Sequence, residues 1–203
     1  MRIGIPKERR PGETRVAATP ETVKKLVKAG HEVLVEREAG VASDITDAAY
    51  EEAGAQMVDT AGAFGAELVA KVRGPMEEEL PQLKAGSTLL GMLNPYHADG
   101  LARLAATGVT AFALEAAPRT TRAQSLDVLS SQANIAGYKA VLVAANLYQR
   151  FFPMMMTAAG TAKAARVVIL GAGVAGLQAI ATARRLGAVV EASDVRPAVK
   201  EQI

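Results

Sequence analysis

The sequence of 203 residues contains no cysteine. Neither a disulfide framework nor a thiolate metal site can therefore form. Histidine is also scarce, because His31 and His97 are the only two in the chain, which is too few for a typical zinc site. Because both kinds of ligand are missing or scarce, we expect no bound metal ion.

A large excess of charge of one sign is missing as well. The chain has 23 Lys and Arg residues against 21 Asp and Glu residues, a formal net charge of only +2. A nucleic-acid partner held by bulk charge requires a much larger positive excess than this. We therefore expect no nucleic acid among the partners.

Long apolar runs are absent too. The most apolar region, residues 140–162, contains Arg150 and Pro153 and is flanked by Lys139 and Lys163. No run therefore reaches the roughly 20 apolar residues that a membrane span needs. The first ten residues, MRIGIPKERR, lack the apolar segment of a signal peptide. We expect a soluble protein without direct membrane insertion.

What the sequence does contain is a regular alternation of strand and helix patterns, and half of its residues are apolar, enough to bury a core. Predicted strands cover residues 2–6, 31–36, 56–58, 67–72, 87–93 and 109–114. Predicted helices between them cover residues 20–29, 44–53, 76–83 and 98–106. This alternation predicts a doubly wound parallel sheet. No glycine fingerprint follows any of these strands, so this region is not obviously a nucleotide binder by itself.

The clearest motif lies between residues 166 and 194. A β-branched run leads into Gly171, Gly173 and Gly176, which form G-x-G-x-x-G, and a helix pattern and a second strand follow. The three glycines permit, in order, a tight turn, close approach of a pyrophosphate, and close packing of helix on strand. The helix N-terminus offers free N–H groups and partial positive charge to the phosphates. These features predict a dinucleotide site; a glycine-rich structural turn is the alternative explanation.

Asp194 lies about 20 residues beyond the glycines, where a carboxylate accepts hydrogen bonds from the adenosine ribose. A carboxylate there repels a 2′-phosphate, so NAD is expected in preference to NADP. Arg196 is interpreted as pairing near Asp194 or touching the pyrophosphate. The expected cofactor contacts of this stretch are Gly171, Gly173, Val174, Gly176, Asp194, Val195 and Arg196.

The fold class expected from these patterns is α/β, with two doubly wound Rossmann-like domains. Residues 1–128 are assigned to the N-terminal domain, and residues 129–163 to a long linking helix and a Met-rich segment. Such Met-rich runs are most often core or domain-interface filler. Residues 164–203 are assigned to the beginning of an NAD-binding Rossmann domain, which we expect to be truncated at the C-terminus because such a domain needs further βα units.

The polar stretch APRTTRAQSLD, residues 117–127, follows the last predicted strand of the first domain. Polar residues after a strand suit a ligand crevice at the carboxyl ends of a parallel sheet. A solvated loop with a surface ion pair explains the same composition, and the residues alone do not decide between the two.

Several long stretches resemble the family of alanine dehydrogenases and proton-pumping transhydrogenases: RIGIPKERRPGETRVAATP, GHEVLVEREAG and GAGVAGLQAIATARRLGAVVEASDVRP. Alanine dehydrogenases carry a substrate-binding Lys and a catalytic His where this chain has Arg73 and Asn94. Asparagine cannot give or take a proton at neutral pH, so the general acid–base residue for a reaction on an amino acid is missing.

The stretches PRTTRAQSLDVLSSQANIAGYKAV and FFPMMMTAAGT are instead similar to the NAD(H)-binding component of the transhydrogenases. In that branch the equivalents of Arg119, Gln124, Asp127 and Ser130 form a loop around the nicotinamide. The resemblance therefore implies catalytic roles for Arg119, Gln124 and Asp127. It also implies cofactor contacts from Arg119, Thr120, Arg122, Gln124, Asp127 and Ser130.

The activity that the resemblance implies is hydride transfer between NADH, bound here, and NADP⁺ held only on a partner component. In the full complex this transfer is coupled to proton translocation. The implied partners are the NADP(H)-binding and membrane-spanning components and a second copy of this chain, with the protein cytoplasmic and peripheral to the inner (plasma) membrane. Two alternatives stay open: an alanine-dehydrogenase-like oxidoreductase and a non-catalytic NAD-binding module.

Overall fold

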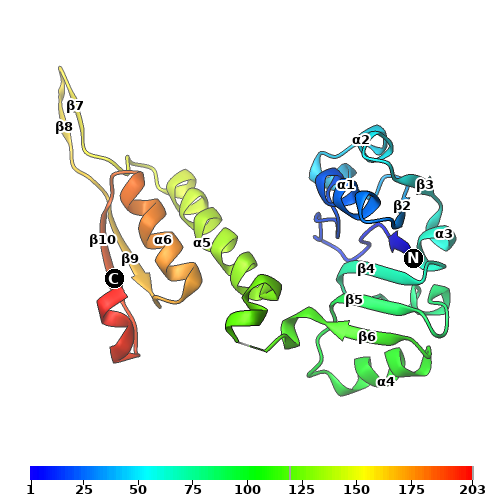
Figure 1. Cartoon of the computed structure of the whole chain (residues 1–203). Coiled ribbons are helices and arrows are strands. Elements are labelled where there is room, and N and C mark those ends of the chain that lie inside the picture. Colours follow the sequence, from blue (N-terminus) through cyan, green and yellow to red (C-terminus); the bar gives the residue numbers. More distant parts are fainter. Residues whose placement is uncertain (119, 203) are drawn as a thin grey trace. The chain divides into compact units, whose positions relative to one another are not determined.

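The computed structural model describes residues 1–118 and 120–202. The chain forms two compact units, unit 1 from Met1 to Leu126 and unit 2 from Asp127 to Ile203 (Figure 1). Each unit contains parallel strands connected by helices, so the α/β class predicted from the sequence is confirmed.

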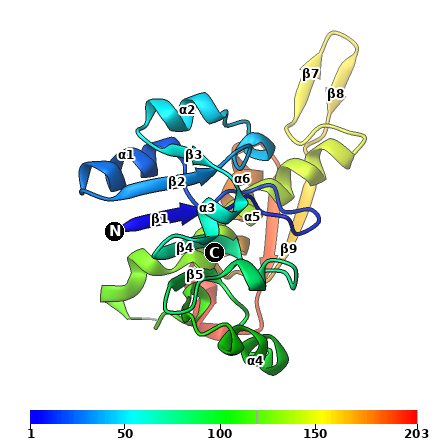
Figure 2. The same ribbon diagram turned by 90° about the vertical axis from the view of Figure 1, so that its right-hand side faces the viewer.

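The described residues of unit 1 form one parallel sheet of six strands, in the order β3-β2-β1-β4-β5-β6. Figure 2 shows β3, β2, β1, β4 and β5 following one another in this order. The chain runs outward from β1 to β3 and returns to β4 on the other side of β1, which is the doubly wound topology that the sequence predicted. The strands are β1 Arg2–Ile5, β2 Glu32–Glu36, β3 Gln56–Val58, β4 Leu68–Arg73, β5 Thr88–Met92 and β6 Thr110–Ala113.

Side-chain caps mark the starts of several helices in unit 1. The Oγ1 of Thr19 accepts a hydrogen bond from the N–H of Thr22 at 3.3 Å, and Pro20 is the first helical residue of α1. Asp59 caps a short helix that the sequence did not predict, with its Oδ1 2.8 Å from the N of Gly62. The helices are α1 Pro20–Lys28, α2 Asp47–Glu52, α3 Thr60–Phe64 and α4 Ala98–Ala106.

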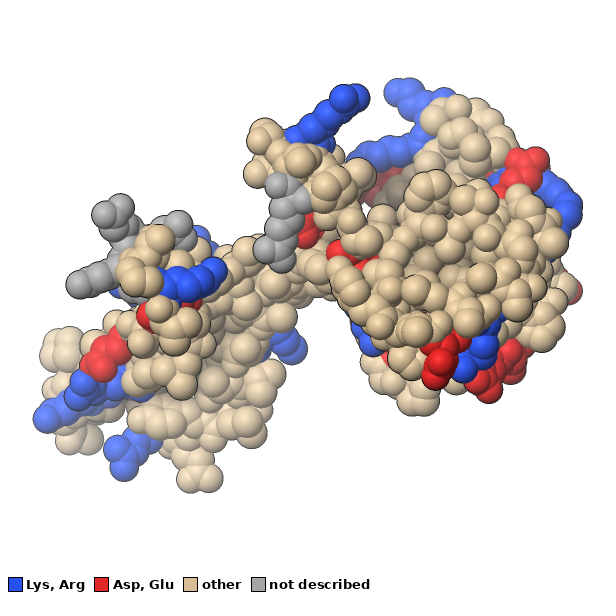
Figure 3. Space-filling view, turned by 90° about the horizontal axis from the view of Figure 1, so that it is seen from below, with Lys and Arg blue, Asp and Glu red and all other residues tan. Residues whose placement is uncertain are grey.

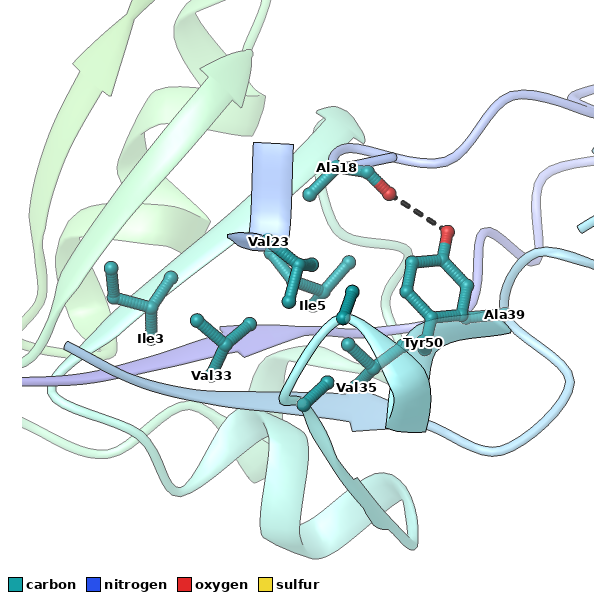
Figure 4. Packing of buried hydrophobic residues seen from close by; sticks show 10 residues of the cluster. Ile3, Ile5, Ala18, Val23, Val33, Val35, Ala39 and Tyr50 are labelled. Atoms are coloured by element: carbon teal, nitrogen blue, oxygen red, sulfur yellow. Dashed lines mark hydrogen bonds between the residues drawn. The ribbon is translucent and has the colours of Figure 1, made fainter. Parts of the chain in front are cut away.

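Both faces of this sheet are covered by apolar side chains. On one face, Val23 of α1 and Tyr50 of α2 pack on Ile5, Val33 and Val35 (Figure 4). The hydroxyl of Tyr50 donates to the carbonyl oxygen of Ala18 at 2.8 Å, and burial raises the pKa of Tyr50 to about 12. The cluster on the other face consists of Phe64, Val69, Leu83, Leu89 and Leu104.

A buried charge network ties the end of β4 to its neighbours. The Nζ of Lys71 lies 3.0 Å from the Oε1 of Glu79 and 3.5 Å from the Oε2 of Glu8, and all three side chains are at most 3% exposed. The other oxygen of Glu8 accepts a hydrogen bond from the N–H of Val72 at 2.6 Å. Burial raises the pKa of Glu8, while the ammonium of Lys71 opposes that rise. The network therefore anchors the loop after β1 to the end of β4.

The predicted helix over residues 76–83 is wrong. The structure has turns there, with a short 3₁₀ helix at Leu80–Gln82. Pro81 lacks an N–H and disfavours α-helix in the residues before it. Glu79 points inward to Lys71 and also accepts the N–H of Met76 at 2.8 Å. The polar residues of this segment suggested an exposed helix, but one of them, Glu79, belongs to the buried ion-pair network.

Unit 2 combines a long helix with the beginning of a second parallel sheet. The helix α5 packs beside α6 around Val141, Ala179 and Ala183. Strands β9 and β10 pair in parallel, with Leu170 opposite Ser193. The elements are α5 Val128–Leu147, β7 Met155–Thr157, β8 Gly160–Ala162, β9 Arg166–Leu170, α6 Val174–Arg185, β10 Val189–Ser193 and a 3₁₀ helix at Pro197–Gln202.

The methionines of the Met-rich segment are exposed in this chain, whereas Phe152, just before them, belongs to the core of unit 2. The segment continues into an antiparallel hairpin of β7 and β8 that the sequence did not predict. Met154 is 62% exposed and Met156 is 77% exposed. The core explanation of these methionines is therefore wrong, and the interface explanation stays a prediction.

Charged side chains of both signs lie near one another on the surface. Figure 3 shows Lys and Arg beside Asp and Glu on the viewed face of unit 1. Exposed pairs include Lys25 with Glu21 on α1 and Arg166 with Glu191 across β9 and β10. Across the residues that the structure describes, no helix combines the length and apolarity needed to cross a bilayer.

Replacing Lys71 with Met should lower the free energy of unfolding by about 3 kcal/mol at neutral pH, because Glu8 and Glu79 lose a shared buried cation. Since Glu8 has a raised pKa, lowering the pH neutralises it and the loss should shrink. Urea unfolding at pH 7 and pH 4 measures both effects.

The matched control is Lys25→Met, which removes a lysine from an exposed pair whose side chains are 75% and 78% exposed. That change should cost less than about 1 kcal/mol. Equal losses in the two variants would show that the buried network does not stabilise unit 1.

Candidate dinucleotide site

The turn between β9 and α6 depends on two glycines. Gly171 has a φ of 95°, a left-handed conformation, and its N–H donates to the carbonyl oxygen of Ser193 at 2.7 Å. A Cβ on Gly176 would lie 1.8 Å from the carbonyl oxygen of Gly171, closer than atoms can approach. Only glycine therefore lets the first turn of α6 pack this closely on the end of β9.

Gly173 differs because the space beside it is open. A Cβ there would meet, among the described atoms, only the Nη2 of Arg196 at 3.9 Å. Gly173 is also the N-cap of α6, and no side-chain hydrogen bond is described at this cap. The first N–H groups of a helix have no partner within the helix and bind anions readily. Free donors with room beside them fit the pyrophosphate of a dinucleotide.

Asp194 lies beside this turn, because β10 ends opposite the end of β9. Its Oδ2 accepts a hydrogen bond from the N–H of Ala172 at 2.8 Å, and its Oδ1 accepts one from the N–H of Arg196 at 2.8 Å. The Arg196 guanidinium adds two more, from Nε at 2.9 Å and Nη2 at 3.0 Å. This guanidinium, helped by the two backbone N–H groups, holds the pKa of Asp194 well below its usual range. The carboxylate is therefore ionised at any physiological pH.

The other two expected contacts of this stretch are apolar and open to solvent. Val174, the first residue of α6, is 44% exposed. Val195 is 99% exposed and lies between Asp194 and Arg196. Both are therefore free to contact a ligand at the turn.

Asp127 and Ser130 lie at the start of α5 and bond to each other. Asp127 is the N-cap, with its Oδ1 2.9 Å from the Ser130 N and its Oδ2 2.7 Å from the Ser130 Oγ. Both residues belong to unit 2, which also contains the glycine turn. The structure thus gives Asp127 a capping role that the sequence did not suggest.

The link between these residues and the glycine turn is Gly137, which the sequence did not single out. A Cβ on Gly137 would lie 2.1 Å from the carbonyl oxygen of Ala175, so α5 touches the first turn of α6 there. Ser130 precedes Gly137 by seven residues, which is about 10 Å along a helix. Figure 1 shows α5 and α6 side by side. The two halves of the expected site in unit 2 are therefore held by one helix crossing.

The remaining expected residues come from the polar loop of unit 1. Thr120, Arg122 and Gln124 are exposed, the last two in the 3₁₀ helix Thr121–Leu126. Arg119 lies outside the described residues. Contact between these side chains and a ligand on unit 2 stays a prediction.

Asn94, at the position of the dehydrogenase histidine, follows β5. Its φ is 54°, in the left-handed region where asparagine is one of the favoured residues. Its N–H donates to Glu115 Oε1 at 2.6 Å. The nearest histidine, His97, caps α4, with its Nδ1 3.0 Å from the N of Gly100. Asn94 has no titratable group, and the Nδ1 of His97 is engaged as a helix cap. No metal-binding cluster of His, Asp or Glu occurs among residues 1–118 and 120–202.

Comparison with known proteins identifies the family. The family profile described as "Alanine dehydrogenase/PNT, N-terminal domain" matches residues 4–136, and the profile of its C-terminal domain matches residues 140–203. The chain is 53% identical to a Rhodospirillum rubrum protein named as the first portion of "NAD(P) transhydrogenase subunit alpha". This match covers all of the present chain and 55% of that protein.

Solved structures agree with these matches. The transhydrogenase from Sinorhizobium meliloti superposes with a TM-score of 0.96 at 53% identity, over all of this chain and 61% of that one. An L-alanine dehydrogenase superposes with a TM-score of 0.84 at 33% identity, over 97% of this chain and 55% of that one. The chain thus spans between 55% and 61% of the length of these three relatives. On the family profiles and these similarities, the chain belongs to the alanine dehydrogenase/PNT family.

Proposed function

We propose that this chain is the NAD(H)-binding component of an NAD(P) transhydrogenase. The observation that carries the proposal is the open space at Gly173, at a helix N-terminus and beside the ionised carboxylate of Asp194. Donors for a pyrophosphate and an acceptor for a ribose lie next to each other there. The sequence similarity to a transhydrogenase subunit selects the activity.

When bound, NADH supplies a hydride with its electron pair from C4 of the nicotinamide to C4 of NADP⁺ on a partner component, leaving NAD⁺ and NADPH. The chain itself has to bind, orient the ring and exclude water, and needs no acid or base for this transfer. The placement of Asn94 and His97 agrees with that requirement.

Within this proposal, the residues divide into two groups. The glycine turn and Asp194 hold the adenosine and pyrophosphate. Ser130, fixed by Asp127, and the exposed Gln124 act at the nicotinamide end. The roles proposed for Arg119, Thr120 and Arg122 are contacts to the same end of the cofactor.

An alanine-dehydrogenase-like activity is the second candidate, because an L-alanine dehydrogenase superposes on almost the whole chain. Arg73 and Asn94 stand where that branch has its Lys and His. Arg15, the residue that resembles the substrate-carboxylate arginine of that branch, binds Glu13 through Nε at 2.7 Å and Nη2 at 2.6 Å. These residues favour the transhydrogenase.

The partners proposed with this function are the NADP(H)-binding and membrane-spanning components and a second copy of the chain. The protein would then lie in the cytoplasm, peripheral to the inner membrane through those components. A non-catalytic NAD-binding module is the third candidate, since the chain covers only a portion of its relatives.

One assay separates the three candidates. The chain is mixed with NADH, an NADP⁺ analogue and the NADP(H)-binding component, and absorbance follows reduction of the analogue. Transfer supports the proposal. Oxidation of NADH that depends on pyruvate and ammonia supports the dehydrogenase, and binding of NADH without either reaction supports the module.

Replacing Gly173 with Ala should weaken NADH binding at least tenfold, a loss of about 1.4 kcal/mol, because a methyl group enters the space proposed for the pyrophosphate. The fold should be almost unaffected, with less than about 1 kcal/mol lost at the helix cap. NADH fluorescence titration and thermal unfolding measure the two effects.

The control is Gly176→Ala, whose methyl group would collide with the Gly171 carbonyl and should destabilise unit 2 with or without ligand. A Gly173→Ala variant that binds NADH as tightly as the unchanged chain would contradict the pyrophosphate assignment.

Replacing Gln124 with Asn should slow hydride transfer about tenfold while changing the NADH dissociation constant by less than about twofold, because a shorter side chain misplaces the ring without removing the main binding contacts. Stopped-flow transfer in the presence of the partner component measures the rate. Gln82→Asn changes another exposed glutamine of unit 1 and should alter neither quantity. Unchanged transfer in the Gln124 variant would remove this residue from the proposed site.

A further inference from the structure

The ion pair with Arg196 uses hydrogen-bond acceptor positions of Asp194 that a bound ribose would need. A carboxylate offers about four lone-pair positions for hydrogen bonds. In the described chain, Asp194 already accepts four hydrogen bonds, from the Ala172 N–H and from the backbone N–H, Nε and Nη2 of Arg196. Its side chain is only 6% exposed. A ribose hydroxyl can therefore bond to Asp194 only by replacing one of these donors.

The four donors are not equally replaceable. The N–H groups of Ala172 and Arg196 belong to the backbone; Ala172 lies in the glycine turn, and the carbonyl oxygen of Arg196 accepts a hydrogen bond from the N–H of Val199. The other two belong to a guanidinium on a side chain that is 60% exposed. An exposed side chain can rotate about its own bonds, whereas a backbone donor moves only if the turn deforms, so the guanidinium is the donor that a ligand can replace.

The guanidinium also lies next to the space proposed for the pyrophosphate. Its Nη2 is 3.9 Å from the position of a Cβ on Gly173, the N-cap of α6. A rotation of the Arg196 side chain away from Asp194 can bring it to an anion at the helix N-terminus without moving the backbone. Guanidinium and phosphate form strong, charge-assisted hydrogen bonds.

We propose that Arg196 is an exchangeable counter-ion: the adenosine ribose displaces its guanidinium from Asp194, and the guanidinium then pairs with the pyrophosphate. This inference rests on the proposed function. It makes Arg196 a residue that selects nucleotides over nucleosides. Either ligand breaks the ion pair with Asp194, but only a ligand with a phosphate offers the guanidinium a new anion. The exchange also leaves Asp194 facing the ribose 2′ position, where the carboxylate still repels a 2′-phosphate.

The test compares adenosine with ADP-ribose in the full chain and in Arg196→Ala. The variant keeps the backbone N–H at position 196 and the Ala172 N–H, so Asp194 stays held. Adenosine should bind about threefold more tightly, since its ribose no longer competes with the Arg196 guanidinium for Asp194. ADP-ribose should bind about tenfold more weakly, since its pyrophosphate loses a charged donor. Competition with bound NADH, followed by the loss of its fluorescence, measures both affinities.

The matched control is Arg166→Ala. Arg166 also pairs with a carboxylate, that of Glu191 on the neighbouring strand, and it lies at the opposite end of β9 from the glycine turn. The control changes the net charge equally and should leave the ratio of the two affinities unchanged. The conservative variant Arg196→Lys loses the forked pair but keeps the charge, so adenosine should again bind more tightly while ADP-ribose weakens less than in Arg196→Ala.

A direct readout of the exchange is the ¹⁵N-labelled Nε–H resonance of Arg196. When adenosine binds, the Nε–H of Arg196 should lose its hydrogen bond to Asp194 and exchange faster with solvent. When ADP-ribose binds, the Nε–H should stay protected, because the pyrophosphate accepts its hydrogen bond instead. If adenosine and ADP-ribose weaken by the same factor in both variants, Arg196 only positions Asp194 and the exchange is wrong. If the unchanged chain binds no ADP-ribose, the proposed nucleotide site fails together with it.

Discussion

The contact on which the candidate site depends is the close approach of α6 to the end of β9, where Gly176 faces the carbonyl oxygen of Gly171. This contact fixes the direction in which the first N–H groups of α6 point. It also holds the N–H of Ala172 in reach of Asp194, although the two are far apart in the sequence. A side chain at Gly176 would therefore disturb both the N-terminus of α6 and the position of the Asp194 carboxylate.

A second close approach extends the site along unit 2. Because Gly137 lets α5 touch α6 at Ala175, the start of α5 is held at a fixed offset from the glycine turn. Asp127 and Ser130 are in turn fixed to each other at that start. Helix packing therefore fixes the distance between the start of α5 and the glycine turn, although the β7–β8 hairpin and β9 separate the two helices in the sequence.

The sequence predicted those features that local patterns determine. The strands of both sheets follow apolar runs, and the glycine turn has a fixed spacing. It failed where distant residues decide the local structure: residues 76–83 are not a helix, because Glu79 turns inward to Lys71 and Pro81 interrupts the segment. Gly137 could not be recognised either, since a single glycine in a helix pattern gives no sign of its packing partner. For Arg196 the sequence left two partners open, and the structure shows Asp194 as the one it holds.

Tyr50 has a practical consequence for how the two units can be observed. The chain has no tryptophan and four tyrosines. Tyr50 is fully buried in unit 1, whereas Tyr138 and Tyr148 of unit 2 are 48% and 43% exposed. Exposure of the Tyr50 phenol therefore reports unfolding of unit 1 in the ultraviolet spectrum. The nicotinamide that we propose for unit 2 would receive no energy transfer from tryptophan of this chain, because the chain has none. Tyr50 absorbance and nicotinamide emission would therefore follow the two units separately.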